Sequence, residues 1–555
     1  MTDLKEDLSK KFLSYLDKKQ YKRLQFEAEM LGDIDEQDPL IMFYYASSIY
    51  LDEASKDEDL LHSSLLFKKV YLGKNHMRSL YNMIAVSFKT KVFREVLPLV
   101  KEAHEKDQDD NILIEGLARI HFYLGNRKES IKFFKKLYEK LPEKKEGRLP
   151  FISMLNYTSG ISQEYYMKEC LNYVSLLEKK LNIENDKFEF KWEKNSKIKL
   201  SFLSADFKTH SVSHFLKDLL KKINKSSYEI HLISNLKAFE HDDMSIELKK
   251  LAHHWHDVEN YSDNELTIFL RSLNLDFLID LSGFTNGNRF ESLVRRCAKI
   301  QIEWLGYNNS LGSRNIDYLI SDKNLIMPNE HDMYKEKILY LPKIWNALSS
   351  PKSLPDIINK SKQNNSEIIF CSFNNFQKIS DNTIKVWSKI LNETKSKLML
   401  KNSLIGGEDL KNNVLDKFIQ NNVKLEQLLF LDREKNIFDH LNLYNKANIA
   451  LDTFPYPGVT TSYEAILMGL PVLTMKGFNF NSRCGESINK NIEMDDLIAI
   501  NEEDYLNKAI LLSQEKNLDE KYGTNLRNKA LTSPLFDTDQ FTKDFENLLN
   551  EINKK

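Results

Sequence analysis

Four polar segments follow short apolar runs after residue 197, and their side chains could bind a phosphorylated ligand. These segments are "SADFKTHSVSHF", "SGFTNGNR", "SFNNFQKIS" and "LDTFPYPGVTTSYE". In the last segment we expect Thr460 and Thr461 at the first turn of a helix, where backbone amides, hydroxyls and the helix dipole favour a pyrophosphate. Glu464, about one turn later, could accept hydrogen bonds from ribose hydroxyls. Lys378, in the third segment, would add a positive charge.

Each of these residues also has a simpler structural explanation. Thr460 could only cap the helix, and Glu464 could be a solvated acid that complements the helix dipole. A single lysine in a loop, such as Lys378, is usually exposed to solvent. Taken alone, none of the three residues identifies a ligand.

Histidine pairs raise the question of a metal site. His210 and His214 are four residues apart, but no third ligand is evident near them. The run "HHWH" at 253–256 ends an amphipathic helix that enters a strand, which favours packing and helix capping. Asp-x-Asp pairs, which chelate a divalent ion in many nucleotide-sugar enzymes, occur only in the helical N-terminal region and near Asp537. The sequence therefore predicts a donor site without a metal or other cofactor.

Two series of alternating strands and helices must position the polar segments. From Lys197 onward, "KIKLSFLS", "YEIHLISN", "LDFLIDLSGF" and "KIQIEWLGY" read as strands separated by helix-like stretches. A second series contains "EIIFCSFNN", "SKLMLKN", "ANIALDTF" and "LPVLTM", after a segment rich in Pro, Ser and Asn. This alternation predicts two doubly wound parallel sheets. Ligands of such sheets bind beyond the carboxyl ends of the strands.

The first 185 residues contain almost no strand signal. The segment 117–142 reads as two amphipathic helices joined at residues 124–126, with a small residue at Ala118 and a closing Pro142. This pattern fits a tetratricopeptide repeat of about 34 residues, and it recurs one period earlier around Ala85. Stacked repeats leave a concave surface suited to polypeptide. A helical bundle without repeat identity is the alternative.

Composition limits the class of protein. A chain of 555 residues with a formal net charge of -2 predicts several domains and no general attraction to nucleic acid. Four cysteines without a CxxC pair argue against a disulfide scaffold. The charged N-terminus has no signal-peptide core, and no run reaches the roughly 18 to 20 apolar residues of a membrane span. We expect a cytoplasmic protein, and the sequence leaves the oligomeric state open.

Seven segments occur in an order that resembles the O-linked N-acetylglucosamine transferase and SPINDLY family of protein glycosyltransferases. They are "FLSADFKTHSVSHFL", "DLSGFTNGNR", "IQIEWLGYNNSLG", "DYLISD", "FCSFNNFQKISDNTIKVWSKIL", "LDTFPYPGVTTSYEAILMGLPVLTM" and "SPLFDTDQFTKDFENLL". The resemblance implies an α/β GT-B fold of two Rossmann-like halves, preceded by an all-α tetratricopeptide superhelix. The short spacer between the halves is similar to that of bacterial-type members.

The resemblance and the strand pattern together predict four parts of the chain. Their limits are 1–185 for the repeat domain, 186–345 for the acceptor-side half, 346–366 for the linker, and 367–555 for the donor-binding half, whose final helix crosses back.

The resemblance also implies roles for individual residues. His210 falls on an active-site histidine that could act as the base or only orient a substrate, and Lys378 falls on a lysine that contacts the diphosphate and supports its departure. The other positions match residues that contact the donor: Asn375, His440 beside the base, Gly458, Thr460 and Thr461 at the diphosphate, and Glu464 at the ribose.

Several positions depart from the family pattern. Val459 stands where animal N-acetylglucosamine enzymes have histidine and SPINDLY-type enzymes have threonine. "AKIQ" at 298–301 replaces the usual Ala-Pro, and Asn308 and Asn309 alter the acceptor-side loop. "THSVS" is closer to the SPINDLY form, whose plant members use GDP-fucose. These departures leave the sugar and its nucleotide open.

The resemblance implies an inverting, metal-independent transfer of a sugar, with N-acetylglucosamine favoured, from a nucleotide-sugar donor to Ser or Thr of a protein. The acceptor would run from the repeat surface into the cleft between the two halves. Another donor such as GDP-fucose, or an asparagine or glycan acceptor, is the alternative within this fold. A non-catalytic repeat scaffold with a decayed transferase is the alternative of a different class.

Overall fold

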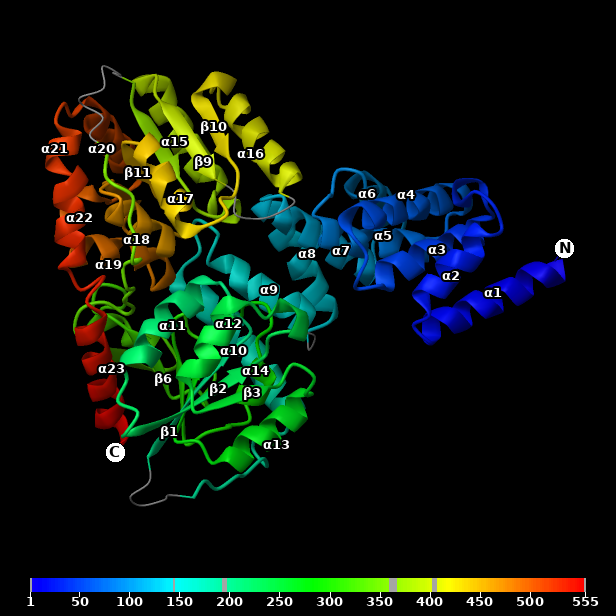
Figure 1. Cartoon of the computed structure of the whole chain (residues 1–555), viewed down its shortest axis with the longest axis horizontal. Coiled ribbons are helices and arrows are strands. Elements are labelled where there is room, and N and C mark those ends of the chain that lie inside the picture. The colour runs from blue at the N-terminus through cyan, green and yellow to red at the C-terminus, as the bar shows by residue number, and fades with distance from the viewer. Residues whose placement is uncertain (1, 143–144, 192–196, 359–366, 402–406, 554–555) are drawn as a thin grey trace. The chain divides into compact units, whose positions relative to one another are not determined.

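The computed structural model describes residues 2–142, 145–191, 197–358, 367–401 and 407–553. The chain divides into two compact units, shown with their elements in Figure 1. Residues 1–140 and 404–416 make up the first unit, and residues 141–403 and 417–555 make up the second.

The first unit is helical throughout the part of residues 1–140 that the structure describes, which confirms the predicted all-α region. Its α-helices are α1 (Thr2–Asp17), α2 (Tyr21–Glu29), α3 (Pro39–Leu51), α4 (Asp57–Lys74), α5 (Met77–Thr90), α6 (Leu97–Lys106), α7 (Asn111–Tyr123) and α8 (Arg127–Lys140). Consecutive helices pack on one another, as α3 does on α4, α4 on α5 and α7 on α8. This packing buries one apolar cluster that includes Phe67, Leu80 and Leu117.

Helices α7 and α8 form the helix-turn-helix predicted at 117–142. Gly125 makes the turn with a φ of 74°, a backbone conformation that residues other than glycine rarely adopt. The Ser130 hydroxyl donates to the Ala118 carbonyl oxygen at 2.7 Å, which requires a small residue at that point of the interface. Phe134 is 1% exposed and fills the space between the helices. The arrangement is consistent with tetratricopeptide-like repeats.

The next two helices, α9 (Lys145–Leu155) and α10 (Gln163–Lys180), belong to the second unit. Tyr166 of α10 shares a hydrogen bond of 2.9 Å with the Tyr307 hydroxyl, and both side chains are buried. The N-terminal segment of the first unit therefore ends at residue 140, whereas the repeat domain was predicted to continue to residue 185. An amphipathic pattern predicts that a helix buries one face but not which neighbour covers that face.

The second unit contains two parallel sheets. The strand order of the first is β3-β2-β1-β4-β5-β6-β7. Its strands are β1 (Ile198–Ser204), β2 (Tyr228–Ser234), β3 (His254–Asp257), β4 (Phe277–Asp280), β5 (Ile300–Glu303), β6 (Tyr318–Ser321) and β7 (Lys337–Tyr340). The α-helices between them are α11 (Ser211–Lys222), α12 (Asp243–Leu251), α13 (Asp263–Leu273) and α14 (Phe290–Leu293).

The second sheet has the order β10-β9-β8-β11-β12-β13. Its strands are β8 (Ile369–Ser372), β9 (Lys397–Lys401), β10 (Leu428–Leu431), β11 (Ile449–Leu451), β12 (Val472–Met475) and β13 (Ile498–Ala499). The helices of this half are α15 (Asp381–Thr394), α17 (Ile437–Asn442), α18 (Thr460–Leu467), α19 (Cys484–Asn491), α20 (Glu502–Gln514), α21 (Leu518–Lys521) and α22 (Gly523–Leu531). Helix α16 (Glu408–Gln420) follows β9 in the chain, but its residues up to 416 belong to the first unit. Both sheets are the parallel, doubly wound sheets that the sequence predicts.

The last helix, α23 (Thr538–Asn553), follows the second half in the chain but packs on the first. The ring of Phe545 lies 5.0 Å from that of Trp304, at the end of β5. Lys222, at the end of α11, donates to the Thr538 hydroxyl at 2.7 Å. Figure 1 shows α23 in red beside the green strands and helices of the first half.

The segment between the halves was predicted as a linker at 346–366. Its described residues, up to 358, contain no helix or strand. Tyr463 of α18 donates to the side-chain oxygen of Asn346 at 2.7 Å, so the start of this segment is held against the second half. Residues 359–366 lie outside the described part of the chain. Among the described residues, no helix is long and apolar enough to cross a membrane.

Candidate active site

Asp452 organises the loop that follows β11. One of its carboxylate oxygens accepts hydrogen bonds from the Gly458 amide at 2.6 Å and the Asn374 side chain at 3.1 Å. The other oxygen accepts from the Thr474 hydroxyl at 2.9 Å. Burial raises the pKa of Asp452 to about 6, against the opposing effect of these donors. The carboxyl group thus joins the loops after β8 and β11 at the edge of the sheet where ligands bind.

Gly458 lets the loop approach the start of α18 closely. A Cβ at this position would lie 2.5 Å from the Thr461 hydroxyl oxygen and 2.6 Å from the Asn374 side-chain oxygen. Those two atoms are themselves hydrogen-bonded at 2.7 Å. Helix α18 begins at Thr460 as predicted, and its N-cap residue, Val459, makes no side-chain cap. The Ser462 amide donates to the Val459 carbonyl oxygen at 3.0 Å, and the apolar N-cap leaves the amides of Thr460 and Thr461 to another acceptor, such as a phosphate.

Lys378 ends a short 3-10 helix (Phe376–Lys378) after β8. Its ammonium group donates to the Pro457 carbonyl oxygen at 2.9 Å and lies 4.2 Å from the centre of the Tyr456 ring. Burial lowers the pKa of Lys378, and the carboxyl group of Asp452 opposes the shift. The side chain thus brings a cation against the loop that precedes α18, as a pyrophosphate site requires.

His440 and Glu464 form a pair across α17 and α18. The His440 Nε2 atom lies 2.9 Å from the Glu464 carboxylate, which also accepts a hydrogen bond of 3.0 Å from the Tyr444 hydroxyl. Lys401, the last residue of β9, contacts the other ring nitrogen of His440. Burial lowers the pKa of Lys401, and the charge of Glu464 opposes that shift. These four side chains form a polar surface whose groups could bind the hydroxyls of a ribose and the edge of a base.

His210 is the N-cap residue of α11, where its Nδ1 atom accepts a hydrogen bond of 3.4 Å from the Val212 amide. The same atom lies 3.8 Å from the carboxylate of Asp206. The side chain of His210 is 45% exposed, so it is open to a substrate.

The N-terminal parts of α11 and α18 are in contact. The ring centres of Phe215 and Tyr463 are 5.5 Å apart. His214 is partly buried, which lowers its pKa, and it lies close enough to Glu464 for that carboxylate to oppose the shift. The contact brings His210 of one half towards the candidate donor residues of the other.

Most of the predicted donor residues therefore gather at one edge of the second sheet. Lys378, Gly458 and Thr461 are joined through Asp452, Asn374 and Pro457, and the Tyr444 hydroxyl links Glu464 to the Thr461 carbonyl oxygen at 3.3 Å. Asn375 has a structural role at this edge, and its contact with a donor stays a prediction. Its side chain caps the 3-10 helix by accepting from the Gln377 amide at 3.0 Å, while its neighbour Asn374 makes the contact with Thr461.

The sequence reasoning missed four polar residues of this edge. Asp452 follows strand β11 directly, Asn374 is the second residue after strand β8, and Lys401 is the last residue of strand β9. Tyr444 lies about one helical turn beyond His440. The signal that could have found the first three is their position at the carboxyl end of an apolar run. Tyr444 has no comparable signal, because an aromatic residue on a helix usually belongs to the core.

The altered acceptor-side loop is a structural contact. Asn309 is fully buried and donates to the Asn156 side chain at 2.9 Å. Asn308 is also buried and donates to the Cys484 sulfur at 3.5 Å. The sequence "GYNNS" therefore fastens the segment around α9 and the second half to the first sheet.

The run "HHWH" does not cap a helix. Helix α12 ends at Leu251, and His254 and His256 lie on strand β3, where their side chains stand beside His231 of β2. The helix-capping interpretation is therefore corrected, because the strand begins at His254 itself.

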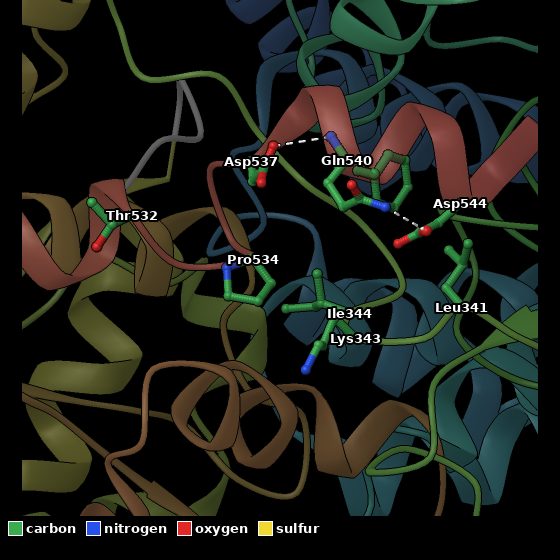
Figure 2. Close-up of a pocket in the computed structure, with 9 residues that line it drawn as sticks. Leu341, Lys343, Ile344, Thr532, Pro534, Asp537, Gln540 and Asp544 are labelled. Carbon is green, nitrogen blue, oxygen red and sulfur yellow. Dashed lines mark hydrogen bonds between the residues drawn. The ribbon is translucent and has the colours of Figure 1, made fainter.

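The cavity in Figure 2 lies elsewhere in the second unit. It has a volume of about 180 Å³, and residues from the end of β7, from the segment after α22 and from α23 line it. None of the predicted donor residues lines this cavity. The candidate site therefore rests on the convergence of side chains at the strand ends.

Comparisons with known proteins agree with the fold. The model of glycosyl transferase family 41 matches residues 150–367 and 357–545. The probable UDP-N-acetylglucosamine–peptide N-acetylglucosaminyltransferase SPINDLY of Solanum lycopersicum is 28% identical over 369 residues, which are 65% of this chain and 40% of that protein. The corresponding protein SEC of Arabidopsis thaliana is 25% identical over 360 residues, 63% of this chain and 36% of that protein. The chain thus spans well under half the length of these two relatives.

A solved structure of a variant of the Thermobaculum terrenum O-GlcNAc transferase has a TM-score of 0.81. It is 22% identical and covers 93% of this chain and 99% of that chain. This likeness confirms the predicted fold, two Rossmann-like GT-B halves after a helical array. With a family model that matches most of the residues between 150 and 545, the chain belongs to glycosyl transferase family 41.

Proposed function

We propose that this protein is an inverting protein glycosyltransferase that moves a sugar, with N-acetylglucosamine favoured, from a nucleotide-sugar donor to a Ser or Thr hydroxyl. The observation that carries the proposal is the junction of Lys378, Gly458 and the start of α18 through Asp452. A cation and a helix N-terminus at one point suit a pyrophosphate, which is the group that leaves during such a transfer.

In this proposal the pyrophosphate of the donor lies at Thr460 and Thr461, where amides of the first turn of α18 can donate to phosphate oxygens. Glu464 is placed at the ribose hydroxyls and His440 beside the base. Support for this placement comes from the pairing of Glu464 with His440 at 2.9 Å, which holds both side chains at one wall.

In the proposed reaction the acceptor oxygen attacks the anomeric carbon as the bond between that carbon and the phosphate oxygen breaks. The electron pair of that bond leaves with the nucleoside diphosphate, and the acceptor proton goes to a base or to solvent. Negative charge grows on the departing phosphates, so Lys378 and the N-terminus of α18 lower the barrier by electrostatic stabilisation. No step in this scheme needs a metal ion, and chelators should leave the rate unchanged.

His210 is the candidate for the base, since its imidazole is 45% exposed and an imidazole nitrogen can accept a proton from an acceptor hydroxyl. A role in orienting the acceptor or the sugar is the alternative. A His210→Ala variant separates the two roles: loss of a base flattens the acidic limb of the pH profile of kcat, whereas loss of an orienting group lowers kcat at every pH.

The identity of the sugar depends on the residues around the first turn of α18. Val459 brings an apolar side chain to the N-cap of this helix. Valine cannot form the hydrogen bond to a nucleotide sugar that a histidine at this position could form. Together with the SPINDLY-like "THSVS", this favours GDP-fucose as a second candidate donor. The acceptor is proposed to be a protein bound along the helical array, with an asparagine side chain or a glycan as the other acceptors to be tested.

The test is incubation of the full chain with UDP-N-acetylglucosamine, GDP-fucose and other nucleotide sugars, with measurement of released nucleoside diphosphate and of the mass added to acceptor peptides. Lys378→Met keeps the apolar stem and removes the charge, so we expect kcat to fall about 10²- to 10³-fold, as for other lost transition-state donors. Lys389→Ala, an exposed lysine of α15 in the same half, is the matched control and should retain full activity.

If no donor is consumed and Lys378→Met changes neither turnover nor donor binding, the enzyme proposal is refuted. A non-catalytic repeat scaffold would then be the better explanation.

A further inference from the structure

A second group of titratable side chains lies on the first sheet, apart from the candidate donor site. Glu229 and His231 lie two residues apart on β2, and His254 and His256 lie two residues apart on β3. Side chains two residues apart on a strand point to the same face. His231 pairs directly with His254 in the register of these parallel strands, so the four side chains converge on one face of the sheet.

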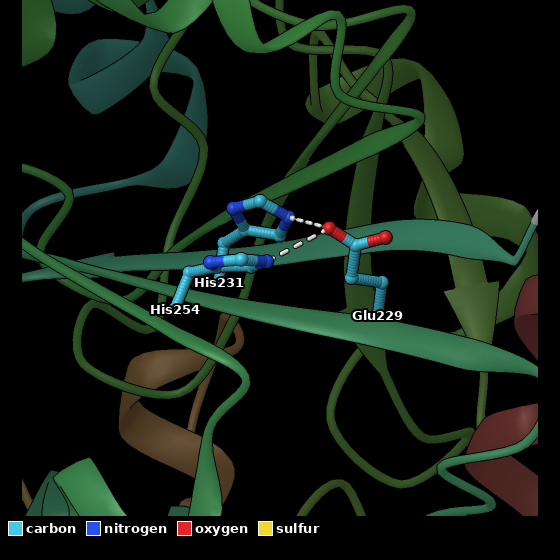
Figure 3. A group of neighbouring side chains, drawn as sticks. All are labelled: Glu229, His231 and His254. Carbon is cyan, nitrogen blue, oxygen red and sulfur yellow. Dashed lines mark hydrogen bonds and ion pairs between the residues drawn. The ribbon is translucent and has the colours of Figure 1, made fainter.

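Three of the side chains direct their ligand atoms to one point. The Nε2 atoms of His231 and His254 lie 3.1 Å and 3.0 Å from the same carboxylate oxygen of Glu229. One ligand atom from each residue lies within 4.8 Å of the other two. Figure 3 shows both imidazole rings turned to that oxygen.

These distances match a small metal ion. Zinc binds imidazole nitrogen and carboxylate oxygen at about 2.0–2.2 Å, which places tetrahedral ligand atoms about 3.3–3.5 Å apart. The two distances from the histidine Nε2 atoms to the Glu229 oxygen, 3.1 Å and 3.0 Å, would therefore need to lengthen by only a few tenths of an ångström to fit a zinc site.

The surroundings also favour a metal ligand at His231. Its side chain is 6% exposed, and its ring lies against those of His254 and His256, with ring centres 4.5 Å and 5.5 Å apart. Its second nitrogen, Nδ1, lies 3.2 Å from the Nε2 atom of His256. A hydrogen bond of this kind to the far nitrogen orients metal-binding histidines and selects the tautomer that leaves Nε2 free to bind.

We propose that Glu229, His231 and His254 bind one divalent transition-metal ion, best matched by zinc, and that this ion fastens strand β3 to β2. The side chain of His254 is 47% exposed, so the ion can enter from solvent and keep a water as its fourth ligand. β3 has four residues and is the edge strand of the sheet, so it has one neighbouring strand to hold it. A metal that cross-links it to β2 would stabilise this edge.

The proposed ion has no part in the sugar transfer. Glu229 is the second residue of β2 and His254 the first residue of β3, which places the cluster near the amino ends of strands. The candidate donor residues follow the carboxyl ends of strands in the other half. The predicted absence of a metal from the donor site is therefore compatible with this second site.

The test uses the full chain without affinity histidines, treated with a chelator that is then removed by dialysis. We expect equilibrium dialysis against zinc chloride with elemental analysis to find one zinc per chain, and we expect zinc to raise the Tm. His254→Ala should bind no zinc above background and should lose the zinc-dependent rise in Tm. Glu229→Gln keeps the size of the side chain and should weaken binding at least 10-fold, because a neutral amide is a poorer ligand.

The matched control is His331→Ala, which removes a histidine beside β7 at the opposite edge of the sheet. This variant should bind zinc as the unaltered chain does. Because His254 is exposed, the metal-free His254→Ala protein should keep the Tm of the metal-free unaltered chain, and both should transfer sugar at the same rate. The proposal is overturned if the unaltered chain binds no zinc, or if His254→Ala binds as much as the control.

Discussion

Replacing Gly458 with alanine tests the geometry of the candidate donor site most directly. The added Cβ would lie 2.5 Å from the Thr461 hydroxyl oxygen, 2.6 Å from the Asn374 side-chain oxygen and 3.0 Å from the Ser462 hydroxyl oxygen. Neither of the two nearest atoms can move away alone, because Asn374 is also bonded to Asp452 and Thr461 belongs to the first turn of α18. The methyl group must therefore separate the hydrogen bond between Thr461 and Asn374.

The expected cost follows from these contacts. A buried amide oxygen that loses its donor costs about 1–3 kcal/mol, and inserting a methyl group into packed structure costs about 1–3 kcal/mol. Since one displacement produces both effects, they overlap. We expect the free energy of unfolding of the second unit to fall by about 2–3 kcal/mol.

The effect on catalysis should be larger than this loss of stability suggests. Relief of the contacts must shift the start of α18 relative to Lys378. A misplacement of about 1 Å can lower a rate about 10²-fold. We therefore expect kcat/KM to fall about 10²-fold at a temperature where the variant is still folded.

The assays are denaturant unfolding of the full chain, calorimetric titration with the donor, and initial rates of nucleoside diphosphate release. Gly73→Ala in α4 is the control, because nothing lies within 4 Å of the added Cβ, and it should leave activity unchanged. In a Thr461→Ala background the stability cost of Gly458→Ala should shrink by about 0.5 kcal/mol or more, as expected for directly coupled residues. Unchanged stability and donor affinity in Gly458→Ala would refute the close approach on which the site is built.

Three further predictions concern the second unit. Glu464→Gln should raise the KM for the donor about 10-fold with little change in kcat, because a ribose contact worth about 1.4 kcal/mol is made equally in the ground and transition states. Burial, with the charge of Asp280, raises the pKa of Glu303 well above its usual value, so this group stabilises the fold at low pH and that stability is lost as the pH rises through the folded-state pKa. Thermal unfolding of Glu303→Gln should therefore show a smaller loss of Tm between pH 5 and pH 8 than the unaltered chain. Phe545→Ala should lower the free energy of unfolding by about 3–5 kcal/mol, because the ring packs fully buried against Trp304.

Each of these predictions has a control and a contrary outcome. Glu503→Gln, an exposed residue of α20, should change neither the KM nor the pH dependence of the Tm. Phe239→Ala removes a ring that is 72% exposed and should cost less than 1 kcal/mol. A fall in kcat alone for Glu464→Gln would place that residue in the chemical step. An unchanged pH slope for Glu303→Gln would mean that Glu303 titrates as an ordinary carboxyl, and a small effect of Phe545→Ala would mean that α23 does not brace the first half.

Much of the architecture follows from local patterns in the sequence. Short apolar runs that alternate with amphipathic stretches are compatible with few arrangements other than parallel doubly wound sheets. The start of α18 at Thr460 and the turn at Gly125 were also predicted, because both depend on residues within one helical turn. Lys378 and Glu464 could be selected from their places after strands.

Other features depended on which segments meet. Asn374 and Asn375 are adjacent and chemically identical. In the folded chain, Asn374 contacts Thr461, whereas Asn375 caps the short 3-10 helix that follows. Which of the two faces Thr461 depends on where strand β8 ends. Helices α9 and α10 carry the same kind of amphipathic pattern as the helices before them. Their place on the first sheet depends on specific contacts such as that between Tyr166 and Tyr307.

By itself, the sequence determined the order and type of the elements and the family resemblance, because helix and strand periods are local properties of the chain. The tertiary structure decided which polar residues share a site. Asp452 reaches Asn374 across 78 positions, and His254 reaches Glu229 across 25. Such contacts depend on strand order and register, which no local pattern encodes, and they determine both the candidate donor site and the proposed metal site.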